Sequence, residues 1–119
     1  MQELRRWPAP GQVETRRFPL VGERTPTARA LDPDVWRLEV EGLVARPLSL
    51  TFDEVLRLPQ EESRFDLHCV TGWSRRATRF EGTRLAHVLE RAGVATAARF
   101  VRFVAYSARG HDTSLPLAV

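Results

Sequence analysis

The single cysteine of the chain, Cys69, is the side chain that could take part in the widest range of chemistry. The residues before it alternate in polarity, which predicts a strand with Phe65, Leu67 and Cys69 on one face and Asp66 and His68 on the other. Thr71-Gly72 then predicts a turn. The thiol is therefore expected where a strand leaves its sheet. Both an inert, packed cysteine and a reactive or metal-binding thiolate fit these residues, because free cysteine is often buried.

The residues around the cysteine supply the other candidate site groups. His68 is expected on the opposite strand face from Cys69, which favours a supporting polar role over direct metal ligation. Arg75 and Arg76, with Arg79 after them, form either a solvated basic loop or a contact for phosphate or an oxyanion, since guanidinium binds such groups bidentately. Trp73 either lines a pocket or packs in the core.

Several other kinds of site are excluded or disfavoured by the sequence. The three histidines and one cysteine lack any recognised zinc spacing. No Ser-His-Asp order, phosphate-binding glycine loop or paired catalytic carboxylate is present. The net charge is +3 with a pI near 10.3, and every basic residue is arginine. These arginines are interleaved with acids, so a basic nucleic-acid-binding module is a weak alternative.

Length and composition indicate one modest α+β domain. The chain has 119 residues, 43% hydrophobic and 28% charged, and contains no apolar run long enough to span a bilayer. A single cysteine cannot form an internal disulfide. Residues 15–18, Thr-Arg-Arg-Phe, faintly resemble a twin-arginine export signal, but Pro19 follows instead of an apolar region. We therefore expect a cytoplasmic protein, or a periplasmic one if an export signal has been removed.

The expected elements follow the chain in the order strand, strand, helix, strand, helix, strand, strand. Residues 1–30, rich in proline and arginine, predict an irregular arm on the surface, with Trp7 and Phe18 as apolar anchors and no helix. Before the cysteine we predict a strand at 36–40, a short strand at 48–50, a helix from the capping box Thr51–Glu54 to Pro59 and an acidic loop at 60–63. The cysteine strand is followed by a basic loop at 74–79 and a helix from an N-cap at Thr83 to Gly93. The chain then continues with a central strand at 100–106, a turn at 108–112 and a strand at 113–117. In the second helix, Leu85, Val88, Leu89 and Ala92 are expected to be buried, and Arg84, Glu90 and Arg91 exposed.

An ordered series of motifs resembles one enzyme family. Residues 69–74, Cys-Val-Thr-Gly-Trp-Ser, followed by an aromatic-x-Gly, are similar to the cysteine segment of sulfite-oxidase-type molybdopterin oxidoreductases. Further stretches resemble the bacterial members of that family in the same order: 6–12, 18–20, 36–44, 46–48, 50–56, 58–59, 82–85 and 89–94. The resemblance covers nearly the whole chain, and the series is more specific than any one motif.

This resemblance implies a fold, a cofactor and a reaction class. The fold would be the mixed α+β sheet of the molybdopterin-binding domain, with 1–30 as the arm and 31–119 as the N-terminal portion of a domain that is truncated here. Cys69 would bind molybdenum beside the pyranopterin, with His68, Thr71, Trp73, Arg75 and Arg76 as cofactor-binding candidates. The reaction would be oxygen-atom transfer with an oxyanion or sulfoxide-type substrate, and a haem protein is a possible electron partner.

Two departures from the family pattern keep an alternative open. Residues 109–111 read Arg-Gly-His where many relatives carry Asp-Gly-Tyr, which puts the chemistry on the substrate side in doubt. The family domain also continues beyond the point that matches Val119. A cofactor-free interaction domain on the same scaffold is therefore the first alternative.

Overall fold

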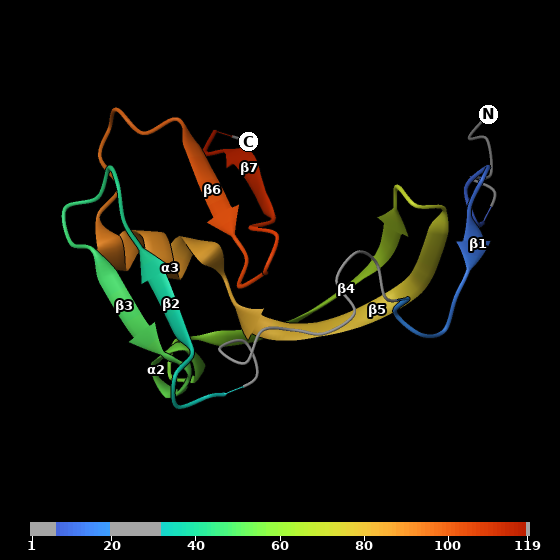
Figure 1. The fold of residues 1–119 in the computed structure, drawn as a ribbon, viewed down its shortest axis with the longest axis horizontal. Coiled ribbons are helices and arrows are strands. Elements are labelled where there is room, and N and C mark those ends of the chain that lie inside the picture. The colour runs from blue at the N-terminus through green and yellow to red at the C-terminus, as the bar shows by residue number, and fades with distance from the viewer. Residues whose placement is uncertain (1–6, 20–31, 119) are drawn as a thin grey trace. The chain divides into compact units, whose positions relative to one another are not determined.

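Two helices and seven strands make up the described part of the chain (Figure 1). The structure is a computed structural model that describes residues 7–19 and 32–118. The elements are β1 (Val13–Glu14), β2 (Arg37–Val40), β3 (Leu48–Thr51), α2 (Phe52–Leu56), β4 (Gln60–Cys69), β5 (Trp73–Thr83), α3 (Leu85–Ala92), β6 (Phe100–Val104) and β7 (Asp112–Pro116). They form a three-stranded sheet ordered β1-β5-β4 and two two-stranded sheets, β2-β3 and β6-β7. This arrangement confirms the expectation of an α+β chain with a mixed sheet.

The chain forms two compact units. One comprises Met1–Leu20 and Glu62–Glu81 and contains Cys69, so we call it the cysteine unit. The other comprises Val21–Glu61 and Gly82–Val119 and contains both helices, so we call it the helix unit. The predicted boundary at residue 30 between arm and domain stays a prediction.

The helix unit follows the sequence pattern in most places. β2 and β3 pair antiparallel, with Leu38 opposite Leu50. The predicted capping box starts α2: the Thr51 hydroxyl accepts the Glu54 N–H at 3.1 Å, and the Glu54 carboxylate accepts the Thr51 N–H at 2.7 Å. The chain then leaves the helix before Pro59. Apolar packing in this unit centres on Leu50, Val88 and Ala92, which are all buried.

α3 ends as predicted but begins differently. Gly93 takes the left-handed conformation at its C-terminus, with φ of 69°. The predicted N-cap at Thr83 is wrong, because the cap position is Arg84, which makes no side-chain capping bond. Val88 and Ala92 are buried and Leu89 is half-buried, but Leu85 is 39% exposed, which corrects the prediction for that residue. Leu85 lies in the first turn of the helix. Arg84, Glu90 and Arg91 are exposed as expected.

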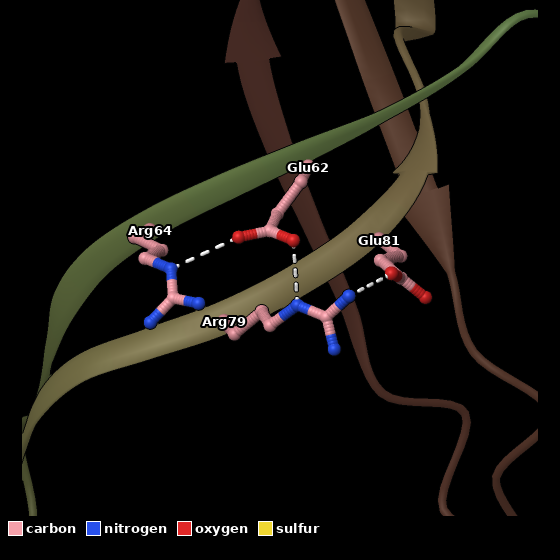
Figure 2. Close-up of polar contacts among 4 residues, drawn as sticks. All are labelled: Glu62, Arg64, Arg79 and Glu81. Atoms are coloured by element: carbon pink, nitrogen blue, oxygen red, sulfur yellow. Dashed lines mark hydrogen bonds and ion pairs between the residues drawn. The ribbon is translucent and has the colours of Figure 1, made fainter.

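Both predicted polar loops are wrong. Residues 60–63 begin β4, and residues 74–79 belong to β5. Their charges suggested loops, but β4 exposes most of its side chains and the buried residues of β5, Ser74 and Thr78, are polar, so the usual alternation of apolar and polar residues is missing. Instead, charged side chains form ion pairs within and between the two strands. Figure 2 shows the Arg79 guanidinium between the carboxylates of Glu62 and Glu81. Arg79 Nε lies 2.6 Å from Glu62 Oε2, and Arg64 Nε lies 2.9 Å from Glu62 Oε1.

Two further predictions need correction. The strand at 100–106 was expected to be central, but within the described residues β6 pairs only with β7, and Phe100 and Val104 are 67% and 63% exposed. Its apolar composition therefore does not reflect burial in this structure. The arm contains no helix within residues 7–19, as predicted, yet Val13–Glu14 forms β1 parallel to β5. The predicted turn near residue 108 and the last strand, β7, are confirmed.

Candidate active site around Cys69

The cysteine lies at the tip of the β4–β5 hairpin. β4 ends at Cys69, and β5 begins at Trp73. The Gly72 N–H donates to the Cys69 carbonyl at 3.0 Å and closes the turn. Gly72 has φ of 98°, a conformation that favours glycine. Because a three-residue link joins only antiparallel strands, β4 and β5 form a hairpin with the thiol at its tip. The sequence predicted the first strand and the turn, but not the second strand.

The Cys69 sulfur is half-buried and close to hydrogen-bond donors. Its Sγ lies 3.0 Å from the Thr71 hydroxyl oxygen. The Thr71 hydroxyl, followed by the Thr71 backbone N–H, lowers the pKa of the Cys69 thiol below its ordinary value, because both hydrogen bonds favour the thiolate over the thiol. Burial of the thiol raises this pKa, and the Trp73 indole N–H lowers it by less than Thr71 does. The indole N–H is buried and has no partner within hydrogen-bond distance. The site therefore favours a thiolate, the form that binds metals.

A chain of polar contacts lies behind the turn. His68 Nδ1 is 2.7 Å from Ser74 Oγ, and Ser74 is completely buried. Ser74 Oγ donates to Gln12 Oε1 at 2.9 Å, and Gln12 Nε2 donates to the Cys69 carbonyl at 3.1 Å. Sequence reasoning did not single out Gln12 or give Ser74 a role. The only sequence signal for them was their presence in stretches that resemble the family, because nothing local connects positions 62 residues apart.

Two of the three arginines of β5 stack on aromatic rings of the arm. The Arg75 guanidinium carbon lies 4.5 Å from the Phe18 ring centroid, and that of Arg76 lies 4.5 Å from the Trp7 ring. The Trp7 ring in turn lies 5.5 Å from the His68 ring. Such contacts hold a guanidinium in place while its edge can still bind anions.

The structure brings all six predicted site residues into the cysteine unit: His68, Cys69, Thr71, Trp73, Arg75 and Arg76. Arg79 also lies in the cysteine unit, but its guanidinium pairs with Glu62 and Glu81. Arg109 and His111 lie between β6 and β7 in the helix unit.

These residues fit a metal that arrives with its own ligands. Among residues 7–19 and 32–118, no group of three or more His, Cys, Asp or Glu side chains could hold a metal ion. Cys69 alone offers one soft sulfur ligand with a lowered pKa. The resemblance to molybdopterin oxidoreductases implies a molybdenum ion that arrives with the dithiolene of a pyranopterin and takes one thiolate from the protein, which Cys69 would supply. The orphan Trp73 N–H would be a further donor.

Comparison with known proteins assigns the family. Residues 24–119 match the family model for the oxidoreductase molybdopterin binding domain, and the chain belongs to this family. It is 42% identical over 86 residues to YuiH of Bacillus subtilis, an uncharacterized oxidoreductase. It is 35% identical over 78 residues to the catalytic subunit of the protein-methionine-sulfoxide reductase MsrP of Ralstonia nicotianae, and 31% identical over 68 residues to that of Campylobacter jejuni.

The aligned residues are a larger share of this chain than of its relatives. They make up 72% of this chain but 42% of YuiH. For the two MsrP subunits they make up 65% and 57% of this chain and 23% of each relative. In the part of the chain that the structure describes, no helix is both long enough and apolar enough to cross a membrane.

Proposed function

We propose that this chain forms part of a molybdopterin-dependent oxidoreductase that moves an oxygen atom to or from a small substrate. The observation that carries the proposal is the Cys69 thiol, half-buried at a hairpin tip, with a pKa that Thr71 lowers. Membership of the molybdopterin-binding family supports this role for the thiol. When bound, the cofactor would supply the two-electron redox chemistry, and the protein would supply binding and orientation.

Each residue of the site has a proposed task. Cys69 binds molybdenum as the thiolate, and Thr71 stabilises that charge through its hydroxyl and N–H. Trp73 provides an indole N–H beside the sulfur and an apolar wall. Arg75 and Arg76 present positive charge to the pterin phosphate or to an anionic substrate, while the arm aromatics restrict their motion. His68 supports the turn from behind, through Ser74.

The substrate class is proposed from the relatives. Two of them are named as catalytic subunits of a protein-methionine-sulfoxide reductase, which favours a sulfoxide over an oxyanion such as sulfite. A one-electron donor such as a haem protein would supply electrons if the reaction runs in the reducing direction. We propose a cytoplasmic location by default, and a periplasmic one if an export signal is removed during maturation.

Metal analysis of the complete natural protein tests the proposal. The protein should be produced in a host that synthesises molybdopterin and should contain molybdenum near one equivalent. Cys69→Ser should reduce sulfoxide reduction more than about 100-fold, because substitution of residues that merely support a metal ligand already costs 10–100-fold. Serine is similar in volume, so circular dichroism should show an unchanged fold.

A neighbouring substitution serves as the control. Val70→Ser introduces the same side chain one position away, at a residue that is 99% exposed, and should retain both molybdenum and activity. Full activity in Cys69→Ser would contradict the role of Cys69. A wild-type protein without molybdenum would favour a cofactor-free interaction domain instead.

A further inference from the structure

Gln12 is a half-buried side chain of the arm that contacts the cysteine turn directly. It precedes residues 24–119, the part of the chain that the family model matches. Its amide nitrogen lies 3.1 Å from the Cys69 carbonyl oxygen, and its amide oxygen lies 2.9 Å from Ser74 Oγ. The side chain thus links the backbone of the cysteine to a completely buried hydroxyl.

The direction of each hydrogen bond in this chain follows from the chemistry of the groups. A carbonyl oxygen only accepts, so Gln12 must present its NH₂ group to Cys69 and its oxygen to Ser74. Ser74 then donates its single proton to Gln12. The contact of 2.7 Å between Ser74 and His68 therefore requires Nδ1–H of His68 to be the donor. The donors run in one direction, from His68 through Ser74 and Gln12 to the Cys69 carbonyl.

The Cys69 carbonyl accepts two hydrogen bonds, which together set the geometry of the turn. One comes from the Gly72 N–H at 3.0 Å and the other from Gln12. Both lone pairs of the oxygen are then used, and the peptide plane after Cys69 cannot rotate without breaking a bond. That plane begins the turn that carries Thr71, whose hydroxyl oxygen lies 3.0 Å from the Cys69 sulfur.

The backbone of the arm supports the same turn. The Val13 N–H donates to the Gly72 carbonyl at 2.9 Å, and the Thr15 N–H donates to the Ser74 carbonyl at 2.8 Å. These bonds keep Gln12 in register with the cysteine turn. Among the described arm residues 7–19, Gln12 is the one whose side chain hydrogen-bonds the cysteine itself.

We propose that Gln12 is a positioning residue for Cys69: its amide locks the Cys69–Gly72 turn and keeps Thr71 on the sulfur, so that the thiolate has one orientation. The importance of this orientation for catalysis rests on the proposed function, whereas the lock itself is a property of the protein without cofactor. Both can therefore be tested separately.

A double-mutant cycle on the cofactor-free chain tests the lock. Gln12→Met has a similar length and shape but has neither donor nor acceptor. It should slow the alkylation of Cys69 by iodoacetamide at neutral pH roughly threefold to tenfold, because the hydroxyl no longer stabilises the thiolate. Exchange of the Gly72 amide, followed by NMR, should become faster. Thr71→Val should slow alkylation to a similar extent, and adding Gln12→Met to it should have little further effect.

Two more variants separate the lock from a general loss of structure. Gln12→Glu keeps the acceptor for Ser74 but turns a carboxylate oxygen toward the Cys69 carbonyl, so it should also speed Gly72 exchange. Gln60→Met removes a glutamine that bonds carbonyls of Val55 and Leu58 in the helix unit, and should leave both measurements unchanged. Circular dichroism should show that every variant is folded.

The proposal is overturned if Gln12→Met leaves alkylation and Gly72 exchange unchanged. Effects of Gln12→Met and Thr71→Val on alkylation that simply add would also overturn it, because Gln12 would then act independently of Thr71. Molybdenum analysis of the complete protein gives a separate answer. If the wild type binds no molybdenum but the cycle behaves as expected, the proposed function fails while the lock stands.

Discussion

The two compact units of the chain are stabilised in different ways. In the cysteine unit, the buried residues among those described are polar, Ser74 and Thr78. In the helix unit, the most deeply buried residues are apolar: Leu50, Val88 and Ala92. The cysteine unit relies on hydrogen bonds between segments far apart in the chain and on stacked rings, such as Phe65 on Phe80 at 4.7 Å. The helix unit relies on burial of apolar side chains.

This difference matches what each unit has to do. Hydrophobic burial depends on the apolar area removed from water and has no preferred direction, so it stabilises a scaffold but does not orient a single atom. Hydrogen bonds depend on distance and angle, so a satisfied polar network holds its members in one geometry. Under the proposed function, a thiol that binds a metal in one orientation would benefit from the second kind of support. Four predictions test the comparison.

The largest effect on stability is expected from Leu50→Ala in the helix unit. Leu50 is only 4% exposed, so the substitution should lower the free energy of unfolding by about 2–4 kcal/mol through lost burial and a remaining cavity. Urea denaturation measures this change. Leu115→Ala removes the same atoms from a side chain that is 54% exposed and should cost less than about 1 kcal/mol. Equal costs for the two variants would show that Leu50 is not part of a packed core.

Ser74→Ala should have the next largest effect, in the cysteine unit. It leaves the Gln12 oxygen and the His68 Nδ1–H without their partner, which should cost about 1–3 kcal/mol. Hydrogen exchange measured by mass spectrometry should show faster exchange in peptides from residues 62–81, with little change around Val88. Ser63→Ala, at an exposed position of β4, is the matched control. Uniform faster exchange across both units would contradict the division into two differently stabilised parts.

Thr51→Ala should have a smaller effect, about 1 kcal/mol, because it removes one half of the capping box of α2. The other half of the capping box, the Glu54 carboxylate, makes the stability of the protein depend on pH. The backbone N–H of Thr51, followed by its side chain, lowers the pKa of Glu54 below its ordinary value of 4.5. A carboxyl with a lowered folded-state pKa stabilises the protein above the unfolded pKa, and this contribution is lost as the pH falls through the folded pKa.

Glu54→Gln is the variant that isolates this contribution. The stability difference between wild type and Glu54→Gln should be full near pH 6 and shrink below about pH 4.5. Urea denaturation at a series of pH values measures it. A difference that stays constant from pH 6 to pH 3 would mean that the ionised carboxylate does not form the cap.

The smallest effect is expected from the ion pairs in Figure 2. Arg79 and Arg64 lower the pKa of Glu62, but the side chains are 52%, 62% and 41% exposed, so water and salt screen the charges. Glu62→Gln should therefore destabilise the protein less than Ser74→Ala does, and about 1 M NaCl should remove most of the difference. A large effect that persists in salt would show that the charges, rather than the buried polar network, stabilise the cysteine unit.

The sequence predicted well where structure depends on neighbouring residues. The capping box at Thr51, the left-handed Gly93 and the turn at Thr71-Gly72 each involve residues within four positions, so their types alone specify the geometry. The cysteine at the end of a strand followed from the same kind of local pattern. The family motifs are likewise a property of the residue order, and the family assignment confirms them.

Predictions from the sequence failed where they depended on how exposed a side chain is in the folded protein. Residues 60–63 of β4 and 74–79 of β5 were predicted as loops because neither segment has an apolar face: 60–63 are exposed, and the buried residues of 74–79 are polar. Leu85 was predicted to be buried from helical periodicity, and residues 100–106 were predicted to be a central strand from their apolar composition. Only the arrangement of neighbouring elements determines whether an apolar side chain is covered.

By itself, the sequence determined the strand that ends at Cys69 and the turn at Thr71-Gly72, because these depend on residues within a few positions of one another. The second strand of the hairpin and the contact of Thr71 with the sulfur came from the structure. Only the tertiary structure decided that Gln12 supports the Cys69 carbonyl and that the arm aromatics hold Arg75 and Arg76. Gln12 and Cys69 are 57 residues apart, and no local rule relates positions at that separation. Their contact depends on the parallel pairing of β1 with β5, whose register aligns the arm with the cysteine turn.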